Sequence, residues 1–235
     1  MNALQPLPSA STAASARTLR QSGEAARERL LRSALLLFAR QGYAKTSTRE
    51  LTEHAGVNVA SISYYFGDKA GLYRAALFEP LDTPQHDAPR ISQAGQTLAQ
   101  ALSCLLAAFV EPLRQGDTAR LCMQLHLREM LEPTGLCEAM AAHSFAPMHE
   151  ALLQVLCRQF GVAQADDELR RLALCIIGLG IQLHVGRDLI DALAPGLNTE
   201  AGALDRWSAR LVGYALAMVD AERARRSEAS TQPQP

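Results

Sequence analysis

Two short helix-forming segments joined by a glycine, within residues 46–69, constrain the fold more than any other feature of the chain. This stretch reads TSTRELTEHAGVNVASISYYFGDK. Ser47-Thr-Arg-Glu50 has the pattern of a capping box, in which the serine hydroxyl accepts from the glutamate amide and the glutamate carboxylate accepts from the serine amide. The pattern predicts a helix over 47–55, a tight turn at Gly56 and a second helix over 58–66, which together form a helix-turn-helix.

The apolar residues of this segment are spaced so that its two helices pack on each other. They are Leu51, Ala55, Val57 and Ile62. Small residues at the start of the second helix would let that end enter a DNA major groove, and tyrosines further along could reach phosphates or thymine methyl groups. The side of the second helix that is left exposed carries Val59, Ala60, Ser61, Ser63, Tyr64 and Tyr65.

One helix is predicted before this motif and one after it. Residues 24–41 repeat apolar side chains at helical spacing, and a left-handed cap is expected at Gly42. A further helix is expected over 68–78. Residues 1–22 are rich in Ala, Ser, Pro and Gln and lack the apolar stretch of a signal peptide, so they are predicted to form a disordered arm. The first domain is therefore expected to span 23–79.

The rest of the chain has the pattern of a second, larger helical domain. Residues 80–90 hold three prolines among polar residues and are predicted to be a linker. Beyond them, apolar side chains recur at helical spacing and aromatic residues make up only 5% of the chain, so the fold is expected to be all-α. The second domain is expected to span 91–225, with helices over 91–115, 118–131, 137–160, 166–190 and 201–225, and with a disordered tail over 226–235.

Charge divides the chain at the same place. Residues 1–80 carry ten Lys and Arg against six Asp and Glu, whereas residues 81–235 carry thirteen against eighteen. A basic N-terminal part on an acidic body favours a DNA-reading head attached to a body that has another role.

Several classes of protein are disfavoured by the sequence. The five cysteines, an odd number at irregular spacing, are expected to be reduced in the cytoplasm, and no apolar run reaches the ~18 residues of a membrane span. The glycine-rich loops of nucleotide-binding proteins and the GxSxG and HExxH motifs of hydrolases do not occur. Cys122 and His126 lie one helical turn apart, but no further ligand pattern accompanies them, so neither a metal nor another cofactor is expected.

The helix-turn-helix and its flanks resemble the DNA-binding domain of the TetR/AcrR family. The matching segments are Phe38-Ala-Arg-Gln-Gly-Tyr43, Thr46-Ser47, Ala55-Gly-Val57, and Tyr64-Tyr-Phe66 followed by Lys69 and Leu72. Ser63 departs from the family, which more often has tyrosine there. In the C-terminal half, Arg128-Glu-Met-Leu-Glu-Pro133 and Ile176-Ile-Gly-Leu-Gly180 resemble the branch of CecR-type regulators. The resemblance implies a homodimeric transcription regulator, usually a repressor, that a small organic molecule releases from double-stranded DNA.

By position in the family motif, DNA contacts fall at the start of the first motif helix and along the second. Phosphate contacts are implied for Thr46, the two tyrosines and Lys69, and base contacts for Ala60 and Ser61. The full implied set is Thr46, Ser47, Arg49, Ala60, Ser61, Ser63, Tyr64, Tyr65 and Lys69. Two copies on a dimer imply a palindromic operator with half-sites ~34–36 Å apart. Alternatively, Arg49 and Lys69 are solvated surface charges.

The resemblance also implies that the second domain binds the effector and forms the dimer through its last two long helices. The apolar stripes of those helices predict an interface that contains Ile176, Leu183, Trp207, Leu211 and Tyr214. Polar side chains on otherwise apolar helices, with neighbouring apolar ones, predict an effector pocket lined by His126, Arg128, His184, Met123 and Phe145. The stripes could instead pack within one subunit, and each polar residue could be a satisfied core or surface group.

Two other functions remain open at this point. One is a constitutive DNA-binding or architectural protein without a small ligand, which would bind its operator whatever compound is added. The other is an enzyme, which would show turnover without affinity for DNA.

Overall fold

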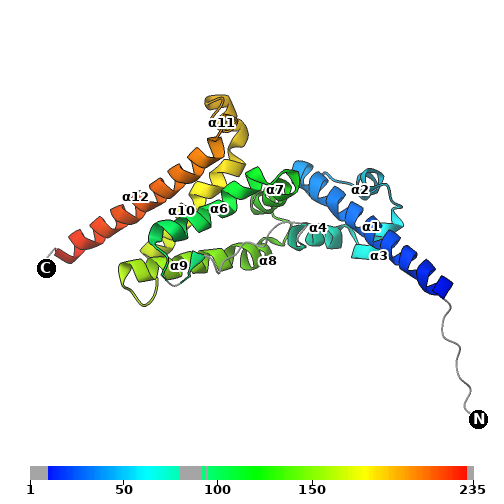
Figure 1. The fold of residues 1–235 in the computed structure, drawn as a ribbon, viewed down its shortest axis with the longest axis horizontal. Helices are drawn as coiled ribbons and strands as arrows, with labels where there is room; N and C mark the ends of the chain where they lie inside the picture. The colour runs from blue at the N-terminus through cyan, green and yellow to red at the C-terminus, as the bar shows by residue number, and fades with distance from the viewer. Residues whose placement is uncertain (1–9, 80–90, 94, 232–235) are drawn as a thin grey trace, which may run out of the picture. The chain divides into compact units, whose positions relative to one another are not determined.

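In a computed structural model, the described residues are 10–79, 91–93 and 95–231, and they form helices joined by turns, without strands (Figure 1). The all-α fold expected from the sequence is confirmed. The chain divides into two compact units, Met1–Glu79 and Pro80–Pro235. The expected linker over 80–90 lies outside the described residues. None of the helices described combines the length and the apolar character that a bilayer crossing requires.

The first unit consists of α1 (Ala10–Gln41), α2 (Thr48–Ala55), α3 (Ala60–Phe66) and α4 (Lys69–Phe78). The helices α2 and α3 pack on α1 and on each other, and α4 packs against α1 and α3. The side chains that they bury together include Leu30, Ala34, Phe38, Leu51, Ile62, Leu72 and Tyr73. This core holds the two helices of the motif in a fixed arrangement.

The turns of the first unit follow local side-chain signals. Ser47 Oγ accepts from the Glu50 amide at 3.1 Å, and Gly56, with φ of 62°, ends α2 in the left-handed conformation. Asn58 Oδ1 accepts from the first amide of α3 at 2.9 Å. The capping box was also expected to include a bond from the Ser47 amide to the Glu50 carboxylate, and that expectation is wrong. The carboxylate instead accepts from Gln41 Nε2 at 2.6 Å, which links α2 to the end of α1.

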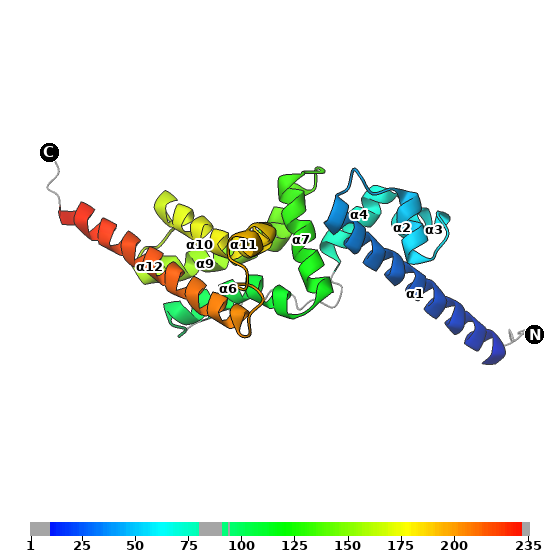
Figure 2. The same cartoon turned by 90° about the horizontal axis from the view of Figure 1, so that it is seen from above.

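The second unit is a larger set of helices. They are α6 (Leu98–Arg114), α7 (Asp117–Leu131), α8 (Cys137–Met140), the π-helical turn η1 (Ala141–Phe145), α9 (Ala146–Phe160), α10 (Asp167–Val185), α11 (Arg187–Leu193) and α12 (Ala203–Thr231). Figures 1 and 2 show α6, α10 and α12 side by side, and each of the three packs against the other two. Their facing sides, together with one side of α9, form the core.

The helices α6 and α10 approach closely at Gly180. A Cβ atom added there would lie 2.4 Å from the ring of Phe109 on α6. One turn later, His184 Nε2 lies 2.8 Å from the carbonyl oxygen of Phe109. Burial lowers the pKa of His184, so its imidazole is neutral and links the two helices by a hydrogen bond.

Helix ends in the first and last helices differ from those expected. α1 begins at Ala10, within the segment expected to be a disordered arm, because the alanine-rich stretch after it favours a continuous helix. α12 continues to Thr231, into the expected tail. Near that end, Arg226 forms an ion pair with Glu222 of the same helix at 2.6 Å. Its second ion pair, with Asp166 at 2.8 Å, attaches the extension to the start of α10.

Internal breaks also differ from expectation. The helix expected to begin at residue 91 begins at Leu98, because Thr97 and Gln100 form a reciprocal capping box. The helix expected over 137–160 contains the π-helical turn η1. The helix expected over 166–190 ends at Val185, and Gly186 separates it from α11.

Candidate DNA-binding surface and effector-binding cluster

The helix α3 presents one side to solvent. Tyr64 is 82% exposed and Val59, which precedes the helix, is 53% exposed. Ala60 and Ser63 are exposed and Ser61 is half-buried. Because this surface carries hydroxyl, methyl and phenol groups, it can contact base edges, thymine methyl groups and phosphates. Val59 is not among the residues assigned DNA contacts from the sequence, although the pattern places it on the exposed side.

Tyr65 differs from Tyr64, although both were assigned the same role. Tyr65 is half-buried, and its ring meets that of Tyr64 edge-on at 4.8 Å between centroids and that of Phe66 at 6.4 Å. A Cβ atom on Gly23 of α1 would lie 3.4 Å from the Tyr65 hydroxyl, so the end of this side chain lies against α1. Adjacent residues of a helix point about 100° apart, which explains the split between them.

The start of α2 is exposed, but one of its expected DNA contacts is wrong. Thr46 is only 1% exposed, and its hydroxyl donates to the carbonyl oxygen of Gly42 at 2.8 Å. Its hydroxyl therefore stabilises the turn between α1 and α2 and is not available to a phosphate. Ser47 is exposed, and the Arg49 guanidinium is also exposed while it forms an ion pair with Glu53 at 2.7 Å.

Lys69 lies at the first position of α4. Its Nζ is 4.2 Å from the centroid of the Tyr43 ring, which is a cation–π distance. Burial lowers the pKa of Lys69, but its side chain is only partly buried, and a lysine needs a very large shift to lose its charge at neutral pH. The ring of Tyr43 thus holds a positive charge next to the end of α3.

Two of the residues predicted to line an effector pocket lie close together in the second unit. The rings of His126 on α7 and Phe145 on η1 are 6.4 Å apart in an edge-on arrangement. Phe145 belongs to the π-helical turn, and π-helical turns occur frequently at functional sites. We call His126, Phe145 and His149, which follows Phe145 by four residues, the imidazole–phenyl cluster.

His149 is a member of this cluster that the sequence reasoning did not identify. It follows Phe145 by one turn on α9. Its Nε2 atom is buried and has no hydrogen-bond partner among the described residues. A buried polar atom without a partner costs free energy, so it is a candidate contact for a bound molecule. Only the spacing from Phe145 could have suggested it.

The other residues expected to anchor an effector have structural partners. His184 bonds to Phe109 as described above, which makes it a link between α6 and α10. Arg128 Nη1 donates to Glu132 at 2.8 Å along α7. Met123 is 7% exposed and belongs to the core. Of the predicted set, the structure thus brings together His126 and Phe145, and it gives the remaining three other roles.

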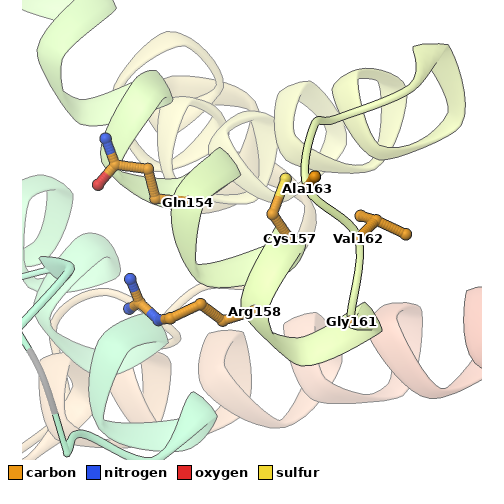
Figure 3. Close-up of a pocket in the computed structure, with 6 residues that line it drawn as sticks. All are labelled: Gln154, Cys157, Arg158, Gly161, Val162 and Ala163. Atoms are coloured by element: carbon orange, nitrogen blue, oxygen red, sulfur yellow. The ribbon is translucent and has the colours of Figure 1, made fainter.

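A shallow groove of about 530 Å³ lies at the C-terminal end of α9 (Figure 3). Gln154 and Arg158 project from one side of α9, and Cys157 faces the turn over 161–163. The groove is lined by none of the residues predicted to bind the effector.

Cysteine chemistry does not define a site. Burial raises the pKa of Cys122 to about 11, so its thiol is protonated at neutral pH and is a poor metal ligand. Among the residues that the structure describes, His, Cys, Asp and Glu side chains form no cluster of three or more that could hold a metal ion.

The residues predicted to form the dimer interface divide between two faces. Ile176, Leu183 and Leu211 are at most 3% exposed and pack inside the core, so their assignment to an interface with another chain is wrong. Trp207 is half-buried, and its Nε1 donates to Asn198 Oδ1 at 3.0 Å. Tyr214 is 52% exposed and remains available to a partner.

The opposite side of α10 is also apolar, and it is exposed. Leu174 is 61% exposed, Val185 is 54% exposed, and Cys175 and Gly178 are exposed between them. On the neighbouring α12, Tyr214 and the adjacent Gly213 are exposed as well. We call the exposed residues Leu174, Cys175, Gly178, Val185, Gly213 and Tyr214 the α10–α12 face.

Comparisons with known proteins agree with this architecture. Residues 30–76 match the family of bacterial regulatory proteins of the tetR type, and residues 98–221 match the C-terminal domain of the HTH-type transcriptional dual regulator CecR. The chain is 28% identical over 179 residues to the dual regulator CecR of Shigella flexneri, covering 72% of this chain and 79% of that protein. It is 29% identical over 172 residues to the transcriptional repressor ComR of Escherichia coli strain K12, covering 69% and 81%.

Solved structures share the fold at lower identity. The hemolysin II regulator HlyIIR has a TM-score of 0.56 at 21% identity and covers 81% of this chain and 98% of its own. The complex of SmeT with triclosan has a TM-score of 0.59 at 20% identity and covers 82% and 90%. Since the match to the CecR C-terminal domain spans more than half of the chain and the tetR-type match covers the helix-turn-helix, this chain belongs to the TetR family of transcription regulators, in its CecR-type branch.

Proposed function

We propose that two copies of this chain bind a palindromic operator through α2 and α3, act there as a repressor, and leave the DNA when a small organic molecule binds the second unit. The observation that carries the proposal is the exposed face of α3, where Tyr64 is 82% exposed on a helix that is otherwise held in a packed domain. Together with the exposed Ala60 and Ser63, Tyr64 presents the methyl, hydroxyl and phenol groups that can contact base edges and phosphates.

The DNA-facing surface combines α3 with the start of α2. The first two amides of α2, those of Thr48 and Arg49, have no acceptor within the helix, and a helix N-terminus favours a phosphate. The exposed methyl groups of Val59 and Ala60 at the start of α3 suit thymine methyl groups. Since α3 carries no Lys or Arg, positive charge near it comes from side chains outside the helix, such as Lys69.

The proposed dimer forms through the α10–α12 face. α10 is apolar on both sides, with one side in the core and the other, including Leu174 and Val185, exposed in the single chain. The exposed side also carries Gln182, but Leu174 and Val185 leave apolar surface there that a partner would cover. A second copy related by a two-fold axis would cover this face on both chains at once, and the glycines at 178 and 213 would permit close approach.

The imidazole–phenyl cluster is the proposed effector site. It offers an aromatic ring at Phe145, an imidazole at His126 and the unpartnered Nε2 of His149. These groups suit an apolar molecule with one or two hydrogen-bonding atoms, such as a phenol. The structural neighbour SmeT, solved with triclosan, and NalD, described as a repressor of a multidrug efflux pump in Pseudomonas aeruginosa, support an organic effector.

A selection experiment tests the proposal. Full-length protein would be used to enrich binding sites from a random-sequence DNA pool, and the enriched duplex would then be titrated with apolar phenols, beginning with triclosan. We expect a palindrome, and a compound that lowers affinity for it by roughly 5–150-fold. A non-palindromic site, or a compound that binds the protein and leaves DNA affinity unchanged throughout its titration, would contradict the proposal. Since the relative CecR is a dual regulator, reporter assays at the selected site would show the direction of control.

Removing the phenol of Tyr64 is expected to weaken DNA binding without unfolding the protein, because the side chain is exposed. Tyr64→Ala and Lys69→Ala should each lower affinity for the selected duplex, and Lys69→Ala, which removes a positive charge, should also reduce the salt dependence by about one unit of slope. Gel shifts at several salt concentrations measure both quantities. Tyr64→Phe separates the hydroxyl from the ring, and Arg120→Ala on α7 is the control. Unchanged affinity and slope in both variants would remove these residues from the interface.

The imidazole–phenyl cluster yields a separate prediction. His126→Ala and His149→Ala should raise the concentration of compound needed for release by roughly tenfold, because each removes a polar contact to the effector. Affinity for DNA without compound should stay within about twofold of the wild type. The exposed His143 on η1 supplies the control, His143→Ala. If both variants respond to a true inducer like the wild type, the effector binds elsewhere.

A further inference from the structure

We propose that Arg27 is a positioning residue that holds the C-terminal end of α3, the recognition helix, at the C-terminal end of α4. Its Nη2 donates to both carboxylate oxygens of Glu79, at 2.7 and 2.8 Å. Its Cζ lies 4.9 Å from the centroid of the Phe66 ring, within cation–π range. One guanidinium on α1 thus contacts the last residue of α3 and the residue that follows α4.

The recognition helix needs such a contact because little else holds it. Within α3, all of which is described, Ile62 is the one fully buried side chain. The helix has only seven residues, and at its start Asn58 Oδ1 accepts from the first amide. A short helix gains most of its stability from tertiary packing. Phe66 therefore serves as the second attachment of α3, and Arg27 covers the face of its ring.

The positions of Phe66 and Glu79 connect this attachment to DNA recognition and to the rest of the chain. Phe66 contacts the ring of Tyr65, which in turn contacts that of Tyr64 on the DNA-facing side. Glu79 is the last residue of the first unit, directly before the chain enters the second unit at Pro80. A displacement of the chain at that junction would move Glu79 and, through its ion pair with Arg27, the end of the recognition helix.

The proposed role differs from a phosphate contact. The charge of Arg27 is balanced by Glu79, and both side chains are only partly exposed, at 37% and 40%. A guanidinium that keeps this partner releases no counterion when DNA binds, so it contributes nothing to the salt dependence of affinity. A positioning residue should change affinity at constant salt slope.

The test uses full-length protein and a duplex enriched by the wild type from a random-sequence pool. Arg27→Gln should lower affinity by roughly fivefold to twentyfold with an unchanged salt slope. Glu79→Gln should lower it less, and should have no further effect in the Arg27→Gln background, because both changes break the same contact. The matched control is Arg32→Gln on the same helix, which breaks an exposed ion pair with Glu28 and should leave affinity unchanged.

Each outcome decides for or against the role of Arg27. Wild-type affinity in Arg27→Gln, or additive effects in the double variant, would overturn it. A slope reduced by one unit would make Arg27 a phosphate contact instead. If Arg27→Gln does not fold, Phe66→Leu removes the ring and keeps the ion pair, and it should reproduce the loss at constant slope; normal affinity there would also overturn the proposal. Failure of the wild type to enrich any duplex would instead count against the proposed function.

Discussion

Leu174→Glu is expected to turn the proposed dimer into a folded monomer and to lower operator affinity by at least about a hundredfold. Leu174 is 61% exposed on α10, so the substitution does not disturb the core of the single chain. In a two-fold interface the new charge would meet apolar side chains or its own symmetry mate, without a partner of opposite sign. A monomer engages one half-site, and it loses the effective concentration that links two binding events, a factor of about 10²–10⁴. Sedimentation and gel shifts measure the two effects.

Two further variants define what this result would mean. Leu131→Glu replaces a similarly exposed leucine, 70% accessible at the end of α7, and should leave the dimer intact. Ile176→Glu, only two residues from Leu174, should unfold the second unit, because Ile176 is completely buried within the chain. A dimeric, DNA-binding Leu174→Glu protein would show that the interface lies on another surface.

The two faces of α10 explain why its interface residues could not be chosen from the sequence. The helix carries apolar residues on both sides, so helical spacing alone does not say which of them a second chain would cover. The stripe through Ile176 and Leu183 packs against α6 and α9, and the stripe through Leu174 is exposed. Which one faces the core depends on contacts with residues more than fifty positions away, such as Phe109, and local periodicity contains no information about them.

The helix-turn-helix could be predicted because its signals are local. The caps at Ser47 and Asn58 and the turn at Gly56 act within a few residues of the groups that they satisfy. The phosphate contact predicted for Thr46 is wrong, although the partner of its hydroxyl is also only four residues away. Its hydroxyl bonds to the carbonyl of Gly42, and that geometry exists only once the turn between α1 and α2 has formed.

Polar residues of the second unit were harder to assign, because a histidine on an apolar helix can be a ligand contact or a structural link. His184 looked like His126 in the sequence, but the structure gives it a backbone partner on α6. No sequence pattern distinguishes His149, and yet its buried Nε2 has no partner within the described part of the chain. Only the arrangement of the surrounding helices distinguishes these cases.

Adding one methyl group to α10 is expected to have opposite effects at two glycines that lie two residues apart. Gly180→Ala should reduce the free energy of unfolding by about 1–3 kcal/mol, because the new Cβ would lie 2.4 Å from the Phe109 ring. Gly178→Ala meets no atom of its own chain within 4 Å, so in the single chain it should increase that free energy by up to about 1 kcal/mol through helix propensity, whereas in the proposed dimer the methyl group would face the second copy. Urea unfolding at several protein concentrations measures both values and separates any contribution from dimerisation.

Phe109 is poorly able to move away from an added methyl group. The contact reaches its Cβ atom, at 2.9 Å, as well as the ring, so a rotation of the ring alone does not relieve it. The carbonyl of the same residue is bonded to His184, which restrains the backbone of α6 at that point. Phe109→Ala removes the ring atoms that make the two 2.4 Å contacts, so in that background the cost of Gly180→Ala should fall well below its cost in the wild type, a coupling of about 0.5–3 kcal/mol. Equal costs in the two backgrounds would show that the helices separate as rigid bodies and that the close approach at Gly180 contributes little to the stability of the second unit.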